Sequence, residues 1–187
     1  VEIAQSIAAA LAQALGRFVT DCGWLSRERS GRVTREARER ATVALSTEAD
    51  DGDAARLVAH LRTSGQLTPA LMLRAILSRS VGFAEVAFAE LSGLAVGRVA
   101  SILREERSGA FRSLYGRAGM PPALRPAFEA SLAAYRELRA KGRSDASLSR
   151  RMVERTLAFC EALPSEEAGK LVALLRRFEA EAAREEA

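Results

Sequence analysis

The sequence predicts an all-α fold, arranged as an array of short antiparallel helical hairpins. Three observations predict it. Apolar residues recur every three or four positions along the chain, which is the period of one face of an α-helix. No segment of four to eight residues combines strand-like alternation with an enrichment in β-branched residues. A central stretch also repeats after 26 residues, an offset that suits one helical hairpin with tight turns.

The first helix is expected over residues 2–22. Its apolar positions are Ile3, Ile7, Leu11, Leu15 and Phe18. Gly23 and Gly31 are expected to enclose a loop, because glycine commonly interrupts or ends helices. The cluster Asp50-Asp51-Gly52-Asp53 predicts a turn that ends in a helix N-cap.

Capping and breaking residues define the later helices. Thr68-Pro69 places a capping hydroxyl before a proline at the first helical position, and Pro164-Ser165 separates the last two helices. The expected helices are 2–22, 33–47, 53–64, 68–79, 83–92, 95–106, 109–117, 122–141, 147–162 and 165–184. The central ones are short, and isolated helices of about eleven residues are marginal in water, so neighbours must stabilise them.

The internal repeat covers a helix, a turn, a second helix and a glycine stop. A shift of 26 residues aligns 73–77 (LRAIL) with 99–103 (VASIL). The same shift aligns Phe88 with Leu114 and Gly93 with Gly119. One such hairpin cannot bury its apolar face alone, whereas stacked hairpins form a continuous core.

The apolar stretch VGFAEVAFAELSGL (81–94) is interpreted as the second helix of one hairpin. Phe88 is expected in the core, together with Phe83, Phe111 and Tyr115 on the apolar faces of the repeat helices. Tyr115 is the aromatic residue expected to keep its polar end at the surface.

Two regions are expected: a helical-repeat array over 1–142, with its clearest repeats at 67–120, and a C-terminal helical hairpin over 143–187. The hairpin either packs on the array or forms a homodimer through 147–185, since one of its faces is apolar.

Composition limits the class of protein. The chain has 187 residues and only two cysteines, Cys22 and Cys160, so neither a disulfide framework nor a zinc motif is indicated. Both cysteines are expected to pack as small apolar residues. No signal peptide or membrane span is expected, which predicts a cytoplasmic protein, and the missing initiator methionine suggests that residues upstream of Val1 are absent.

No catalytic, metal-binding or cofactor-binding motif is present. His60 has no cysteine or carboxylate at ligand spacing on its own helix face, so a packed or surface histidine is expected. The glycines punctuate helices and form no phosphate-binding loop. The sequence therefore predicts a protein that is not an enzyme and needs no cofactor.

The basic charge is concentrated in the middle of the chain. Residues 66–125 contain eight arginines and four acidic residues, while the flanking parts are balanced. The arginines considered for partner binding are Arg74, Arg79, Arg98, Arg104, Arg107, Arg112 and Arg117. Together with Arg125 they could line one side of a stacked array, where phosphate groups or an acidic partner would bind; solvated helix faces are the simpler interpretation.

Three stretches resemble a known family. They are LTPALMLRAILSRSVGFAEVAFAELSGL (67–94), FRSLYGRAGMPPALRPAF (111–128) and LVALLRRFEAEAARE (171–185). They are similar to domain of unknown function family 2336, bacterial and chiefly alphaproteobacterial proteins described as having HEAT-like helical repeats. The resemblance implies a HEAT-like α-solenoid and brings no catalytic residues.

The leading functional hypothesis is a non-enzymatic scaffold that binds a protein or peptide on one face, because helical arrays offer extended surfaces. The alternative is a nucleic-acid-binding protein that uses the basic segment 66–125, an analogy at the level of the fold alone.

Overall fold

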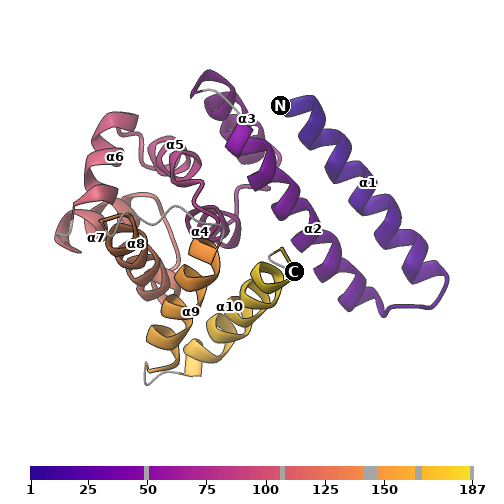
Figure 1. The fold of residues 1–187 in the computed structure, drawn as a ribbon. Coiled ribbons are helices and arrows are strands. Elements are labelled where there is room, and N and C mark those ends of the chain that lie inside the picture. Colours follow the sequence, from indigo (N-terminus) through magenta and orange to yellow (C-terminus); the bar gives the residue numbers. More distant parts are fainter. Residues whose placement is uncertain (49–50, 106–107, 141–146, 163–165, 186–187) are drawn as a thin grey trace. The chain divides into compact units, whose positions relative to one another are not determined.

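A computed structural model describes residues 1–48, 51–105, 108–140, 147–162 and 166–185. These residues form ten α-helices and one 3₁₀ turn, with no strand among them (Figure 1). The all-α prediction is confirmed. The chain divides into two compact units, residues 1–66 and residues 67–187.

The first unit contains α1 (Glu2–Asp21), α2 (Arg27–Glu48) and α3 (Asp51–Thr63). Helices α1 and α2 lie side by side over most of their lengths (Figure 1), and α3 contacts α1. The prediction of a loop between Gly23 and Gly31 is wrong, because α2 begins at Arg27. The Ser26 hydroxyl accepts a hydrogen bond from the Arg29 amide at 3.3 Å, which caps the earlier start, and Gly31 lies inside the helix.

The second unit is built around α4 (Pro69–Leu77). The Thr68 hydroxyl caps this helix by accepting from the Leu71 amide at 3.1 Å, as its sequence predicts. Every residue from Leu71 to Leu77 is buried. A helix that is buried on all sides must be enclosed by other helices, and α4 contacts α5 (Val81–Ser92), α8 (Arg125–Ala140) and α9 (Ser147–Glu161).

The 26-residue repeat corresponds to two successive helix pairs. The first is α4 with α5, and the second is α6 (Val96–Arg104) with α7 (Ser108–Arg117). Gly93 and Gly119, which follow the second helix of each pair, have φ of 69° and 67°. This left-handed conformation favours glycine, which explains why both repeats stop at the same residue type.

Aromatic side chains join these two pairs to α8. Phe88 is completely buried, and its ring lies 5.9 Å from both Phe111 and Phe128, in edge-to-face geometry. Tyr115 packs beside them, and the expectation of a surface-exposed hydroxyl is wrong. That hydroxyl donates to the Pro121 carbonyl at 2.9 Å, and burial raises the pKa of Tyr115 well above its ordinary value.

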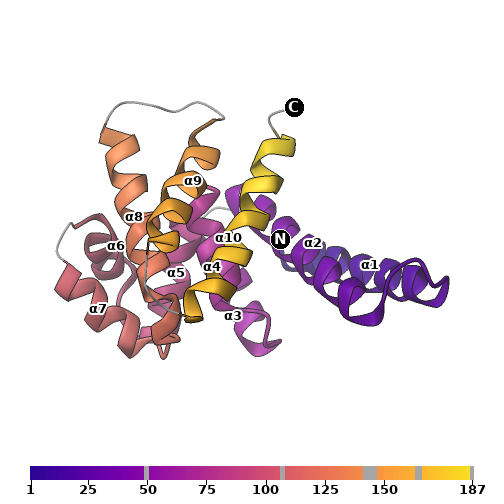
Figure 2. The same cartoon turned by 90° about the horizontal axis from the view of Figure 1, so that it is seen from below.

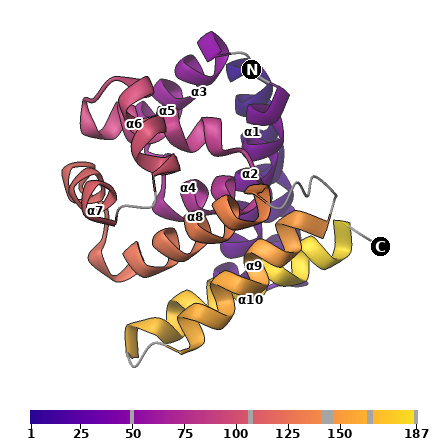
Figure 3. The same ribbon diagram turned by 60° about the vertical axis from the view of Figure 1, so that its left-hand side comes forward.

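The last two helices, α9 and α10 (Glu166–Glu185), form an antiparallel pair (Figures 2 and 3). Helix α9 packs on α8 and α4, and α10 also contacts the 3₁₀ turn Pro122–Leu124. The boundary expected after residue 142 falls inside the second unit, because these contacts join α9 to its neighbours.

Replacing Phe88 by alanine should lower the free energy of unfolding by about 3 to 5 kcal/mol, because a fully buried ring is lost and a cavity remains. Urea denaturation followed by circular dichroism measures this change. Phe159→Ala is the matched control: its ring is 48% exposed, so a change within about 1 kcal/mol is expected. Equal effects of the two substitutions would contradict the assignment of Phe88 to the core.

Candidate functional site

The seven arginines considered for partner binding have different environments. Arg74 is buried, with 4% of its surface exposed. Its guanidinium lies 4.2 Å from the centre of the Phe178 ring, a cation–π contact that joins α4 to α10. Arg74 therefore belongs to the interior of the second unit and is not available to a partner.

Two further arginines support neighbouring helices. Arg104 pairs with Glu85 at 3.2 Å, and Arg117 donates from Nε to the Ser92 carbonyl at the end of α5, at 2.6 Å. Arg79, Arg98 and Arg112 are exposed. Arg107 lies outside the described residues.

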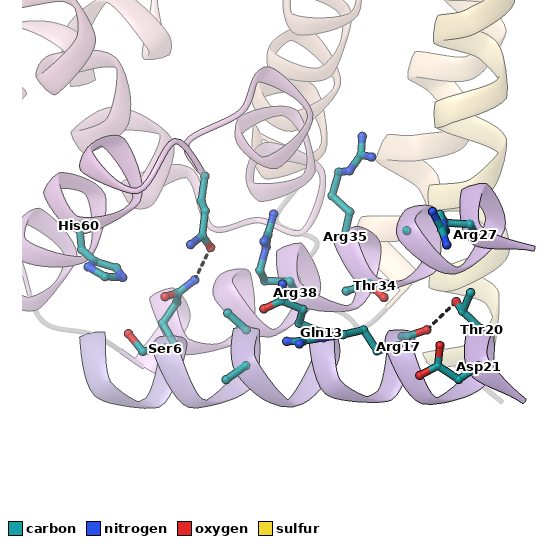
Figure 4. A pocket seen from close by; sticks show the side chains of 16 residues that line it. Ser6, Gln13, Arg17, Thr20, Asp21, Arg27, Thr34, Arg35, Arg38 and His60 are labelled. Carbon is teal, nitrogen blue, oxygen red and sulfur yellow. Dashed lines mark hydrogen bonds between the residues drawn. The ribbon is translucent and has the colours of Figure 1, made fainter.

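A polar cleft of about 810 Å³ lies within the first unit, along α1 and α2 (Figure 4). We call it the α1–α2 cleft. The residues that line it are Gln5, Ser6, Ala9, Ala10, Gln13, Gly16, Arg17, Thr20 and Asp21 from α1, Arg27, Gly31, Thr34, Arg35 and Arg38 from α2, and His60 and Gln66.

The cleft has a close helix contact toward one end. The Gly16 carbonyl accepts hydrogen bonds from the Ser30 hydroxyl at 2.6 Å and from the Thr20 hydroxyl at 2.8 Å. A Cβ atom on Gly16 would overlap Thr34 Oγ1, so a larger residue would force the Thr34 side chain or the two helices to shift. Toward the other end, Gln5 donates to Gln66 at 2.9 Å.

The charge that lines this cleft is mainly positive. Its lining contains four arginines, Arg17, Arg27, Arg35 and Arg38, and a single carboxylate, Asp21. None of these four arginines makes an ion pair with another described residue. Guanidinium groups bind carboxylates and phosphates through two parallel hydrogen bonds, so the lining suits an anion.

The opposite face of α1 carries an exposed apolar row. We define the α1 row as Ile3, Ile7, Leu11, Leu15 and Phe18, whose exposed fractions lie between 54% and 77%. Trp24 extends the row, because its ring packs edge-to-face against Phe18 at 5.8 Å. The spacing of these residues in the sequence predicted one apolar face of a helix. In the structure no other described element covers that face.

A smaller groove of about 410 Å³ lies in the second unit, over α8. Phe111, Leu132 and Phe159 supply its apolar surface. The charges at its rim are engaged locally: Arg155 pairs with Glu137, and Arg136 donates to the carbonyls of Leu103 and Glu105. The groove therefore offers an apolar floor, and its charged lining consists of three carboxylates, Glu105, Glu129 and Glu137, and the two arginines.

The described residues contain no cluster of histidine, cysteine and carboxylate side chains able to hold a metal ion. His60 is half-buried at the α1–α2 cleft. None of the described helices has both the length and the apolar character needed to cross a membrane.

The two cysteines differ, and the expectation that both are buried is wrong for Cys22, which is exposed after the end of α1. Cys160 is buried as expected, and burial raises its pKa to about 11. The thiolate is the reactive form of cysteine, so burial and the raised pKa both protect Cys160.

A thiol reagent at pH 8 should therefore modify Cys22 quickly and Cys160 only after unfolding. Ellman's reagent should release about one equivalent of chromophore from the folded protein and two in guanidinium chloride. The Cys22→Ser variant should show no fast phase. Two fast equivalents from the folded protein would contradict the buried position of Cys160.

Replacing Gly16 by alanine should lower the free energy of unfolding by about 1 to 3 kcal/mol, because the added methyl group overlaps Thr34. Gly31→Ala on α2 is the control, since a Cβ there meets open space; helix propensity should make it stabilising by about 0.5 to 1 kcal/mol. Thermal unfolding followed by the fluorescence of Trp24, the single tryptophan of the chain, reports on this unit. Stabilisation by both alanines would contradict the close contact at Gly16.

The model of family 2336, a domain of unknown function described as an uncharacterised protein conserved in bacteria, matches residues 1–177. The chain belongs to this family. The match extends the resemblance seen in the sequence through the first unit, so the α1–α2 cleft and the α1 row both lie within the family 2336 region. No curated protein and no solved structure matches the chain.

Proposed function

We propose that this family 2336 protein is a non-enzymatic helical interaction module, acting in the cytoplasm, that binds a protein partner through the α1 row. The observation that carries the proposal is the exposure of five large apolar side chains on one face of α1, extended by Trp24. Single exposed apolar residues are common on protein surfaces. A continuous row of them is a mark of an interaction surface.

The packing of α1 supports this proposal. Its face toward α2 carries small residues such as Ala9 and Gly16, while the large residues of the α1 row point away from it. Taking about 150 to 200 Å² for a whole side chain of this kind, the row and Trp24 leave on the order of 700 Å² of apolar surface exposed. That is more than the largest patch of a typical monomer, about 300 to 600 Å².

The partner that fits the α1 row is a second copy of the chain. The row is almost symmetric about Leu11: Ile7 and Leu15 lie four residues to either side, and Ile3 and Phe18 lie eight and seven residues away. A two-fold dimer pairs one surface with itself, so an antiparallel arrangement would place Ile7 of one copy beside Leu15 of the other.

Area and charge agree with self-association. A stable interface buries about 800 Å² on each partner, close to the surface that the row and Trp24 expose. No member of the row is charged, so pairing two rows brings no like charges together. The proposed dimer surface therefore lies on α1, and the surface expected at 147–185 is replaced by it.

The repeat architecture provides the rest of the module. We infer that the α4–α5 and α6–α7 pairs are HEAT-like repeats, supported by their common order of helix, turn, helix and glycine stop. In an extended solenoid each repeat contacts only its neighbours. Helix α4 also contacts α8 and α9, so we infer that the repeats of the second unit fold back into one compact array.

The nucleic-acid alternative receives less support. Of the basic central segment, Arg74 is buried and Arg104 and Arg117 are engaged with neighbouring helices. A phosphate-binding stripe needs its cations exposed on one side. Arg74 does not meet this requirement, while Arg104 and Arg117 are exposed but already bind groups of the chain itself.

The Leu11→Glu variant tests the dimer. A charge at the centre of the row should weaken dimerisation at least about 100-fold, because each dimer contains the substitution twice and a central contact is worth about 2 kcal/mol or more. Sedimentation equilibrium measures the dissociation constant, and circular dichroism checks the fold. Gln13→Glu is the control: it adds the same carboxylate to the same helix away from the row, and the dimer should persist.

A wild-type protein that stays monomeric well above about 1 μM, where a moderate interface would associate, would refute the proposed dimer. Binding of the wild-type monomer to lipid vesicles, lost in Leu11→Glu, would identify a membrane surface as the occupant of the row and would also refute it.

A further inference from the structure

We propose that the α1–α2 cleft binds an elongated anion that carries several phosphate groups. This inference is independent of the α1 row, because the cleft lies on the other side of α1. It assigns a class of ligand to the cleft, whose lining consists largely of arginines and neutral polar residues.

The charges of the cleft lining carry the proposal. Arg17 projects from α1, and Arg27, Arg35 and Arg38 project from α2 (Figure 4). The single carboxylate in the lining is Asp21, and no described residue forms an ion pair with any of the four arginines. A cleft lined by one sign of charge concentrates the electrostatic field and attracts ions of the opposite sign.

The spacing of the arginines favours an elongated ligand. Arg27 and Arg38 are eleven residues apart on α2, which corresponds to about 16 Å along a helix. Between them lies Gly31, where a Cβ atom would meet nothing within 4 Å, so this part of the cleft is open. The volume of about 810 Å³ lies within the range of small-molecule sites. A chain of linked phosphates uses this length better than one inorganic phosphate does.

The neutral lining distinguishes phosphates from two macromolecular ligands. No phenylalanine, tyrosine or tryptophan is among the residues that line the cleft, so nucleic-acid bases have no surface for stacking. The apolar residues there are no larger than alanine, and peptide recognition commonly uses larger apolar pockets or a strand edge. Gln13, Thr34 and Gln66 instead provide hydrogen-bond donors for phosphate oxygens.

Inorganic tripolyphosphate is the probe, titrated into the full chain by isothermal calorimetry at about 0.15 M salt, where charges are screened beyond about 8 Å. The double variant Arg35→Gln with Arg38→Gln should weaken binding at least about tenfold, since charge-assisted hydrogen bonds are lost. The control is Arg29→Gln with Arg32→Gln, which removes the same charge from positions of α2 outside the cleft and should change the affinity less than about twofold, because charges that do not contact the ligand are screened at this salt concentration. Circular dichroism verifies each fold, and Arg38→Gln alone replaces the double variant if that protein does not fold.

Three results would overturn the inference. The first is no detectable binding of tripolyphosphate at concentrations up to about 1 mM, which would mean a dissociation constant weaker than about 1 mM. The second is an equal loss in the cleft and control variants, which would indicate general charge attraction. The third is cleft-dependent binding of a poly-glutamate peptide or an oligonucleotide with no binding of tripolyphosphate. Leu11→Glu should bind tripolyphosphate like the wild type, which separates this test from that of the dimer.

Discussion

The burial of α4 from Leu71 to Leu77 is the constraint on which the second unit depends. All side chains from Leu71 to Leu77 are removed from water, so helices must cover every side of α4. Helices α5, α8 and α9 do so, and Phe178 of α10 covers the guanidinium of Arg74. A charged group in this position is costly to bury, and the aromatic ring offsets part of that cost. The repeat pairs and the C-terminal pair are therefore parts of one core.

The first unit follows a different rule, because α1 packs through its small residues. Gly16 allows close contact with α2 at one point, and polar and basic side chains line the cleft along the two helices. The large apolar residues are consequently left on the outer face. One helix thus presents two surfaces of opposite chemistry, a polar one toward the α1–α2 cleft and an apolar one toward solvent, and these carry the two proposed interactions.

The arginines show how position determines the role of one residue type. Arg74 lies on an aromatic ring in the core, Arg117 binds a helix-terminal carbonyl, and Arg104 pairs with a carboxylate. By contrast, Arg35 and Arg38 line a cleft without a paired carboxylate. Net charge along the sequence pointed to residues 66–125, yet the group of arginines that lines one cleft lies in the charge-balanced first third of the chain. Charge balance in sequence does not prevent charge separation on a folded surface.

The sequence by itself determined the helical class, the Thr68 cap and the repeat with its glycine stops, because these depend on residues within one helix or one hairpin. The apolar character of 81–94 also predicted the burial of Phe88, although the rings that cover it come from other helices. Only the tertiary structure decided the burial of Arg74, the internal hydrogen bond of Tyr115 and the exposure of the α1 row. The physical reason is that periodicity shows which face of a helix is apolar, while the neighbouring helices decide whether that face is covered. The same limit concealed the cleft, whose lining comes from helices that only folding brings together.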